Sequence, residues 1–294
     1  MTTTTGIMAA AVVAGSRRTG LAQAPVPEPS AGEALVRIEG CGVCASSLPV
    51  WEGRPWFSYP LEPGAPGHEG WGVVEALDAE VEGLEVGDRV ALLSYHAFAE
   101  YDVARAELCV PLPPQLDGAP APLEPVGCAV NVLRRAHVRA RQRVAVVGIG
   151  FLGTLVAMLA ERAGADVVRV RRGDDKEEAF ECVIECAGTQ SALDTASALV
   201  AERGRLVVAG YHQDGRRSVD LQSWNWRGID VVNAHERDQR ATVDGMRAAA
   251  ALLAAGELEL APLLTHCTPL ARLDEAFEAA RTRPRGYVKA WVEP

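Results

Sequence analysis

The sequence predicts an α/β protein with a β-rich lobe first and a doubly wound parallel sheet after it. Short β-like runs separated by glycine and proline fill about the first 120 residues. From about Leu123, apolar strand-like runs alternate with helical spacing, which is typical of a parallel sheet covered by helices. A glycine-rich turn at 148–153 lies at the start of this alternation. The 294 residues suffice for two domains with sizeable cores.

The first lobe is predicted to consist almost entirely of strands. Residues 1–18 are expected to contain a frayed terminus and a first strand. Further strands are expected from their alternating apolar residues and flanking turn residues at 33–44, 70–77, 88–95 and 99–113. The tail, 270–294, predicts a helix and a final strand that return to this lobe.

The second lobe follows the order expected of a nucleotide-binding unit. Residues 122–138 have helical spacing, and 143–172 predict strand, glycine turn, helix and strand. Later segments continue the alternation. Strands are expected at 181–188, 204–211 and 228–235, and helices at 191–201 and 239–256.

Composition and charge exclude several classes of function. The net charge is −10 and no run of lysine and arginine stands out, so neither nucleic acid nor a membrane surface is an expected partner. No apolar run reaches the ~18–20 residues of a membrane span, and the N-terminus does not resemble a signal peptide. The seven cysteines predict free thiols in a cytoplasmic protein.

The glycine turn predicts binding of a dinucleotide. Gly148 permits a tight turn, Gly150 lets the backbone approach a pyrophosphate, and Gly153 lets helix and strand pack closely. Phe151 and Leu152, within the turn, are further candidate contacts, and the helix expected from Thr154 presents its N-terminus to the anion. The alternative is a glycine turn with a structural role only. Two glycines that follow later strands are further candidate cofactor contacts, Gly188 and Gly210.

A histidine and a glutamate stand side by side in the stretch PGHEGWGVVEAL. His68 and Glu69 are good metal ligands placed directly before an apolar strand. The pair alone fits either an ordinary turn or one half of a zinc site.

The order CGVC, GHE, VGDRV and AFAEY resembles the medium-chain dehydrogenase/reductase superfamily, in its zinc-dependent alcohol and polyol dehydrogenase branch. The resemblance covers nearly the whole chain. It implies a GroES-like catalytic domain at 1–138 and 265–294 and a Rossmann-type domain at 139–264.

The same resemblance implies a ligand set for one catalytic zinc ion. Cys44 and His68 match the family's ligands, Glu69 matches a direct or alternate ligand, and Glu124 in PLEPVGC matches a further ligand or near-ligand. Ser46 matches the hydroxyl that carries a proton between substrate and solvent. Three or four such ligands with one open position suit a catalytic zinc.

This chain also departs from the family pattern. Ser47 stands where an aspartate usually supports the zinc ligands, and Pro49 stands where a proton-relaying histidine often occurs. The four closely spaced cysteines of the family's structural zinc are missing, so one zinc per chain is expected. Only a few residues, around 172–180, separate two strands of the second domain, which predicts a sheet shortened on its adenosine side.

The predicted function is hydride transfer between a nicotinamide cofactor and a small alcohol or carbonyl substrate. The alternatives are a protein of the same fold that binds a ligand or guides a non-redox rearrangement, and a zinc-free NADPH reductase. Trp51, Trp56, Phe57 and Tyr59 fit either a substrate-pocket wall or the core of the first lobe. Four side chains remain open between pocket, core and surface roles, namely Cys128, His96, His212 and His235.

Two finer expectations concern cofactor choice and assembly. Arg171 and Arg172 occupy the end of the second strand, where NAD-preferring enzymes carry a carboxylate, and this favours NADP(H). Asp174 and Asp175 follow closely and could contact the ribose or pair with the arginines. The edge strand at 228–235 predicts a homodimer or homotetramer.

Overall fold

The computed structural model describes residues 6–174 and 178–294, and these form two compact units. One unit contains residues 1–125 and 246–294, and the other contains residues 126–245. Each unit is described separately below. The domain division at 138/139 and 264/265 stays a prediction. Asp175 lies outside the described residues.

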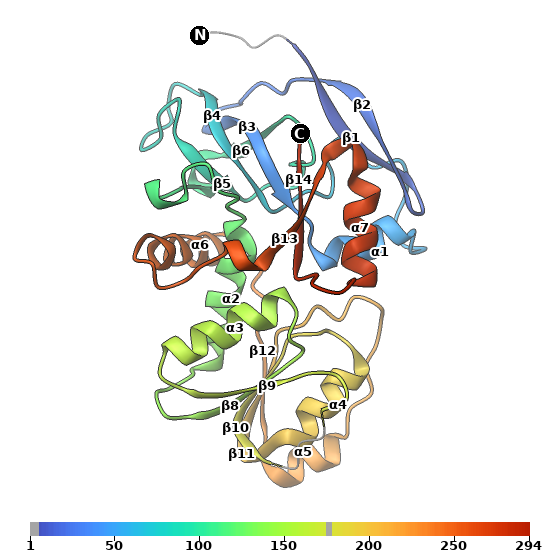
Figure 1. Cartoon of the computed structure of the whole chain (residues 1–294), viewed down its shortest axis with the longest axis vertical. Coiled ribbons are helices and arrows are strands. Elements are labelled where there is room, and N and C mark those ends of the chain that lie inside the picture. Colours follow the sequence, from blue (N-terminus) through green and yellow to red (C-terminus); the bar gives the residue numbers. More distant parts are fainter. Residues whose placement is uncertain (1–5, 175–177) are drawn as a thin grey trace. The chain divides into compact units, whose positions relative to one another are not determined.

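The first unit is built mainly of β-strands (Figure 1). Its strands are β1 (Ile7–Gly15), β2 (Arg18–Pro25), β3 (Glu33–Gly42), β4 (Gly70–Leu77), β5 (Arg89–Leu92), β6 (Tyr101–Arg105), β7 (Cys109–Pro111), β13 (Leu264–Pro269) and β14 (Lys289–Glu293). Two short helices accompany them, α1 (Leu48–Glu52) and α7 (Leu273–Thr282). The predicted strands of this lobe are confirmed, whereas β2 and β13 were not predicted.

Strand β3 is the centre of the main sheet, whose order is β13-β14-β3-β4-β5-β7 with β6 also paired to β3. Its first half pairs with β6, from Glu33 opposite Arg105, and its last residues pair with β14. On its other side, Cys41 lies opposite Gly70 of β4. This register brings the segments after β3 and before β4 together, and these are the segments that carry CGVC and GHE.

The core of this unit is formed by alternate residues of the strands together with one face of α7. The ring of Trp51 stacks on that of Phe277, with centroids 5.5 Å apart, and both rings are buried. Asp274 ties α7 to α1 and to the β1–β2 turn, because it accepts hydrogen bonds from Trp51 Nε1 at 2.7 Å and from the Thr19 amide at 3.0 Å.

The second unit contains a parallel sheet of order β12-β11-β10-β8-β9. Its strands are β8 (Arg143–Val147), β9 (Asp166–Val170), β10 (Phe180–Glu185), β11 (Val200–Val208) and β12 (Asp230–Asn233). Its helices are α3 (Phe151–Arg162), α4 (Gln190–Leu199) and α5 (Leu221–Arg227). Two helices cross the boundary between the units, α2 (Leu123–Ala136) and α6 (Gln239–Ala254).

Helices α3 and α4 cover opposite faces of this sheet (Figure 1). Helix α3 connects β8 to β9 on one side of the sheet centre, and α4 connects β10 to β11 on the other side. Because both crossovers are right-handed, the two helices lie on opposite faces of the sheet. The doubly wound arrangement predicted from the sequence is therefore confirmed.

The sheet is short on the side of β9. In the described residues β9 is an edge strand, and residues 171–174 and 178–179 of the connection to β10 contain neither helix nor strand. This is the shortened sheet that the sequence predicts. Among the described residues, no helix combines the length and the apolar character that crossing a membrane requires.

Candidate active site

Three predicted metal ligands come together in the first unit. A sulfur of Cys44, a ring nitrogen of His68 and a carboxylate oxygen of Glu69 all lie within 4.8 Å of one another. The β3–β4 register accounts for this, because the Gly42 amide donates to the Glu69 carbonyl at 3.0 Å and Cys44 follows two residues later. Of the predicted ligands, Glu124 is not in this cluster. It lies at the start of α2, half-buried, and acts on His68 through its charge.

His68 is oriented so that one ring nitrogen faces the cluster. Its Nδ1 lies 2.9 Å from the carbonyl oxygen of Pro66, and since a carbonyl can only accept, Nδ1 carries the hydrogen. Nε2 is then left to bind a metal, as in other metal sites where a second group fixes the tautomer. The Pro66 carbonyl therefore fixes the orientation of the ring. The Ser47 hydroxyl is buried without a hydrogen-bond partner in the described residues.

The cluster strongly favours a positive charge on the free imidazole. Burial disfavours the charged ring, but the hydrogen bond and the negative charge of Cys44 outweigh it. The charges of Glu124 and Glu69 act in the same direction. Together they raise the pKa of His68 to about 10.

Glu69 has a partner that the sequence analysis missed. The Lys289 ammonium donates to Glu69 Oε1 at 2.6 Å, and both side chains are buried. It also lies 2.5 Å from Oε2 but outside the direction of a hydrogen bond, so Oε2 has an ionic contact and no donor. Burial disfavours the charged ammonium, but the adjacent Glu69 charge outweighs this and holds the pKa of Lys289 above its usual value. One sequence signal points to Lys289, since it is one of only two lysines and stands in the apolar strand YVKAWV.

Ser46 lies among the ligand atoms. Its hydroxyl donates to Cys44 Sγ at 3.1 Å and is 3.5 Å from His68 Nε2. Tyr95, also missed from the sequence, follows β5 and places its half-exposed ring parallel to that of His68, with centroids 6.4 Å apart. Trp51 belongs to the core, whereas Trp56 is 57 % exposed.

The residues of this cluster fit a zinc ion. They offer sulfur, nitrogen and oxygen donors, which is the ligand chemistry of catalytic zinc. His68 can offer a ring nitrogen once it releases its proton, and Glu69 offers a carboxylate oxygen, of which Oε2 accepts no hydrogen bond in the described residues. Cys41, in contrast, is fully buried in β3, and burial raises the pKa of its thiol, which suits a core residue.

The glycine turn of the second unit has the geometry of a phosphate-binding turn. Gly148 follows the buried strand β8 with φ of 93°, a conformation that favours glycine. Gly150 is the N-cap of α3, and Phe151 and Leu152 form its first turn. A Cβ atom on Gly153 would lie 2.0 Å from the Gly148 carbonyl oxygen, so only glycine permits this approach of helix and turn.

The remaining cofactor candidates lie along the same edge of that sheet. Gly188 follows β10, which neighbours β8, and Gly210 follows β11, the next strand beyond β10, so both lie at the same carboxyl edge. The Gly148 amide donates to the Val170 carbonyl at 3.0 Å, so the end of β9 lies next to the turn. Arg171 and Arg172 come next and are exposed. Asp174 accepts a hydrogen bond from the Arg171 backbone amide at 3.0 Å.

The other histidines have different surroundings. His96 faces Glu62 at 3.3 Å, and His235 lies against the ring of Tyr211. His212 forms a buried contact with Glu185, which is considered below.

Comparison with known proteins agrees with these features. Residues 30–114 match the alcohol dehydrogenase GroES-like domain. The 2-dehydro-3-deoxy-L-galactonate 5-dehydrogenase of Pseudoalteromonas atlantica is 24 % identical over 97 % of this chain and 98 % of its own length. Human sorbitol dehydrogenase is 25 % identical over 86 % of this chain and 87 % of its own.

Solved structures share the fold. A thermostable alcohol dehydrogenase from Pyrobaculum aerophilum has a TM-score of 0.85 at 24 % identity and covers 98 % of this chain and 99 % of its own. A Sinorhizobium meliloti protein described as a zinc-binding dehydrogenase, bound to NADP, has a TM-score of 0.81 at 22 % identity, covering 98 % and 100 %. Motifs, fold and relatives agree, and the chain is similar over most of its length to alcohol and polyol dehydrogenases, with an alcohol dehydrogenase GroES-like domain at residues 30–114.

Proposed function

We propose that this dehydrogenase uses one zinc ion and NADP(H) to interconvert a small alcohol and its carbonyl compound by hydride transfer. The observation that carries the proposal is the cluster of Cys44, His68 and Glu69, with the Ser46 hydroxyl within hydrogen-bonding reach of its sulfur. A lone glycine turn would support only nucleotide binding, whereas this cluster supports chemistry on an oxygen atom.

Cys44, His68 and Glu69 would hold the metal, with Glu124 near. A zinc ion bound there supplies a Lewis acid that stabilises negative charge on the substrate oxygen. One ion per chain is expected, because the described residues contain a single such cluster and the sequence lacks the four closely spaced cysteines of a second site. Lys289 keeps the Glu69 carboxylate in place and reduces its net charge.

The Ser46 hydroxyl would take the proton of the substrate alcohol. The Ser46 oxygen can accept that proton while its own hydrogen, which it donates to Cys44 Sγ in the resting site, is released to solvent water. The half-exposed Tyr95 ring beside His68 would form one wall of the substrate site. Relatives that match over most of their own length are named for sugar acids and for sorbitol, so polyols and their keto forms are the first substrate class to examine.

The arginines after β9 favour the phosphorylated cofactor. Two exposed guanidiniums can bind a 2′-phosphate with charge-assisted hydrogen bonds, whereas a carboxylate would repel it. Asp174 is engaged with the Arg171 amide. Arg171→Asp should lower the preference for NADP(H) over NAD(H) by about ten- to a hundredfold in dissociation constants. A wild-type protein that binds NAD(H) equally well would contradict this assignment.

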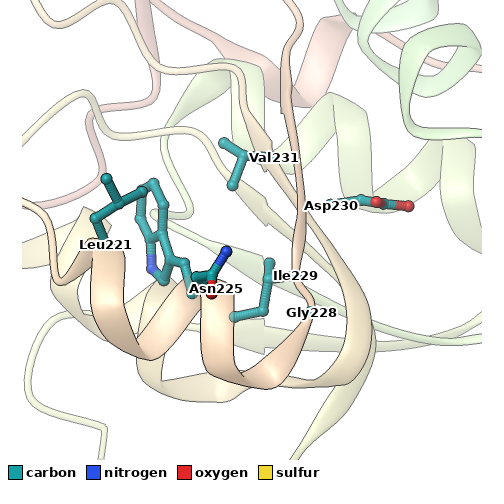
Figure 2. Close-up of a pocket in the computed structure, with 7 residues that line it drawn as sticks. Leu221, Asn225, Gly228, Ile229, Asp230 and Val231 are labelled. Atoms are coloured by element: carbon teal, nitrogen blue, oxygen red, sulfur yellow. The ribbon is translucent and has the colours of Figure 1, made fainter.

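A second copy of the chain is the proposed partner at strand β12. In the described residues β12 has no neighbour on its outer side. Beside it, helix α5 and the strand line an open surface pocket of about 360 Å³ (Figure 2). Trp226 is 88 % exposed and Leu221 68 % exposed on that helix. Pairing of two β12 edges would satisfy the free backbone groups and cover apolar side chains.

We also propose a cytoplasmic location. The structure shows all seven cysteines as unpaired thiols, as expected of a reducing compartment.

The decisive experiment combines metal analysis with turnover. The purified protein should contain one zinc per chain and should oxidise polyols or reduce their keto forms, followed by the absorbance of NADPH. Cys44→Ser and His68→Ala should lose both zinc and turnover, while Cys41→Ala, altered three residues from Cys44 but in the core, should retain the metal. Ser46→Ala should keep zinc and lower kcat by roughly 10²–10⁴.

Two outcomes would contradict the zinc mechanism. Full turnover without zinc would favour a zinc-free reductase, an alternative consistent with the pairing of Glu69 with Lys289. Zinc without binding of either nicotinamide cofactor would favour a protein without a redox role.

A further inference from the structure

A glutamate in the second unit is buried with both of its carboxylate oxygens engaged. Glu185 ends β10, the middle strand of the sheet, and none of its surface is exposed. Its Oε1 accepts hydrogen bonds from the amides of Ala187 and Gly188, each at 2.7 Å. Its Oε2 lies 3.0 Å from His212 Nε2. The carboxylate is thus the centre of a polar network at the carboxyl edge of the sheet.

The third member of this network decides which nitrogen of His212 carries the hydrogen. Arg217 Nε donates to His212 Nδ1 at 2.7 Å. Because a guanidinium has donors only, Nδ1 must be an acceptor, and the ring hydrogen must be on Nε2. Nε2 therefore donates to Glu185, and the three side chains form a relay that runs in one direction, from Arg217 through His212 to Glu185.

The relay joins two loops that strand pairing leaves unsupported. Gly188 is held from both sides, since its amide donates to Glu185 and its carbonyl accepts from Arg217 at 3.0 Å. The Gly210 amide donates to the Glu185 carbonyl at 2.8 Å. Gln190, at the start of α4, exchanges hydrogen bonds of 2.7 and 2.9 Å with Ser218.

We propose that Glu185, His212 and Arg217 are positioning residues for the cofactor: their side chains hold Gly188 in the backbone conformation that receives the nicotinamide nucleotide. The inference rests on the proposed function, because it requires this edge to bind that cofactor. Ligands of parallel α/β sheets bind beyond the carboxyl ends of the strands, where both glycines lie. The relay fixes the backbone at this edge. Through the neutral His212 ring it also links the Arg217 guanidinium to the buried Glu185 carboxylate.

Glu185→Gln tests the relay by changing one acceptor into a donor. The new amide group would face the N–H of His212, donor against donor, so the relay must break. We expect the KM for NADP(H) to rise about ten- to a hundredfold, while kcat at saturating cofactor changes less than about threefold. Glu178→Gln, the same substitution at an exposed ion pair with Arg143 in the same unit, serves as the control and should leave KM unchanged.

Arg217→Gln is the second variant and keeps the test open if Glu185→Gln does not fold. It alters a side chain that is 14 % exposed and should raise KM by a similar factor. Either substitution breaks the same relay. The KM for NADP(H) of the double variant should therefore be no higher than that of the more strongly affected single variant. If the two factors multiply, the residues act independently and the relay is wrong.

The tautomer of His212 supplies a readout that does not depend on turnover. In cofactor-free wild type, side-chain ¹⁵N NMR should show the hydrogen on Nε2, and a hydrogen on Nδ1 would overturn the proposal. If wild type binds the cofactor and the variants bind it equally well, the relay does not position the cofactor. If wild type binds neither nicotinamide cofactor, the proposed function fails together with this inference.

Discussion

At the scale of single residues, the buried ion pair of Glu69 and Lys289 is the feature of the metal cluster with the largest expected effect on the free energy of unfolding. Both charges are buried, and each would be costly to leave alone in an apolar environment. The pair therefore contributes less to stability than its short distance suggests, but the loss of either member is expensive.

We expect Lys289→Met to lower the free energy of unfolding of the metal-free protein by about 3–5 kcal/mol, because Glu69 is left buried and unpaired. The double variant Glu69→Gln, Lys289→Met removes both charges and should recover most of that loss. Urea unfolding in the presence of a chelator measures both values. Equal destabilisation in the single and double variants would show that packing around Lys289, rather than charge, accounts for the effect.

The charge state of His68 makes zinc binding depend on pH. The metal-free site raises the pKa of His68 to about 10, so the ring is protonated below that pH and must release its proton when zinc binds. Apparent zinc affinity should therefore rise with pH, by at least about tenfold per unit between pH 6 and 8. Competition with a chelator of known affinity measures it, and an affinity that is flat over this range would contradict the protonated state.

At the scale of secondary-structure elements, the contact between the glycine turn and α3 decides whether the cofactor site can form. The turn and the helix approach so closely at Gly153 that a methyl group would overlap the Gly148 carbonyl. Strand β8, the turn and α3 must therefore move together.

Gly153→Ala is expected to lower the free energy of unfolding by about 1–3 kcal/mol, because the added methyl forces helix and turn apart. The same shift moves the helix N-terminus, so the dissociation constant for the cofactor should rise at least about tenfold. Gly20→Ala in β2 is the matched control, since nothing lies within 4 Å of the position of its Cβ. Thermal unfolding and fluorescence titration of NADPH give the two readouts, and unchanged cofactor binding in Gly153→Ala would contradict this geometry.

At the scale of the whole molecule, the edge of the second unit's sheet predicts assembly. One chain has a mass of 31.3 kDa, so sedimentation at micromolar concentration should give about twice that value or a higher multiple. Val231→Lys places a charge on β12 and should shift the protein toward the monomer, as charged residues do on natural edge strands. Val86→Lys, another valine exposed in the first unit, should leave the mass unchanged. A wild-type mass of one chain would rule out the assembly.

Local signals in the sequence are enough to predict the fold class and most of the elements. Alternation with period two predicts β3 and β4, and a strand followed by Gly148, Gly150 and Gly153 predicts β8, the turn and α3. These signals are local, since each depends on residues within one element or one turn. The metal ligands within CGVC and GHE, in contrast, were predicted from the resemblance to the medium-chain dehydrogenase/reductase superfamily. Strand β2 and helix α5 were missed, because they have little apolar periodicity and remain largely exposed.

Only the tertiary structure decided how the polar groups are satisfied. Lys289 reaches Glu69 across 220 residues of sequence, and the Pro66 carbonyl rather than a carboxylate orients His68. The relay of Glu185, His212 and Arg217 likewise joins the loops of two strands. A buried charge must find a partner in space, and that partner can come from any segment that the sheet order brings near. The spacing of residues along the chain does not indicate which partner a buried polar group will have. The partner can be identified only once the pairing of the strands is known.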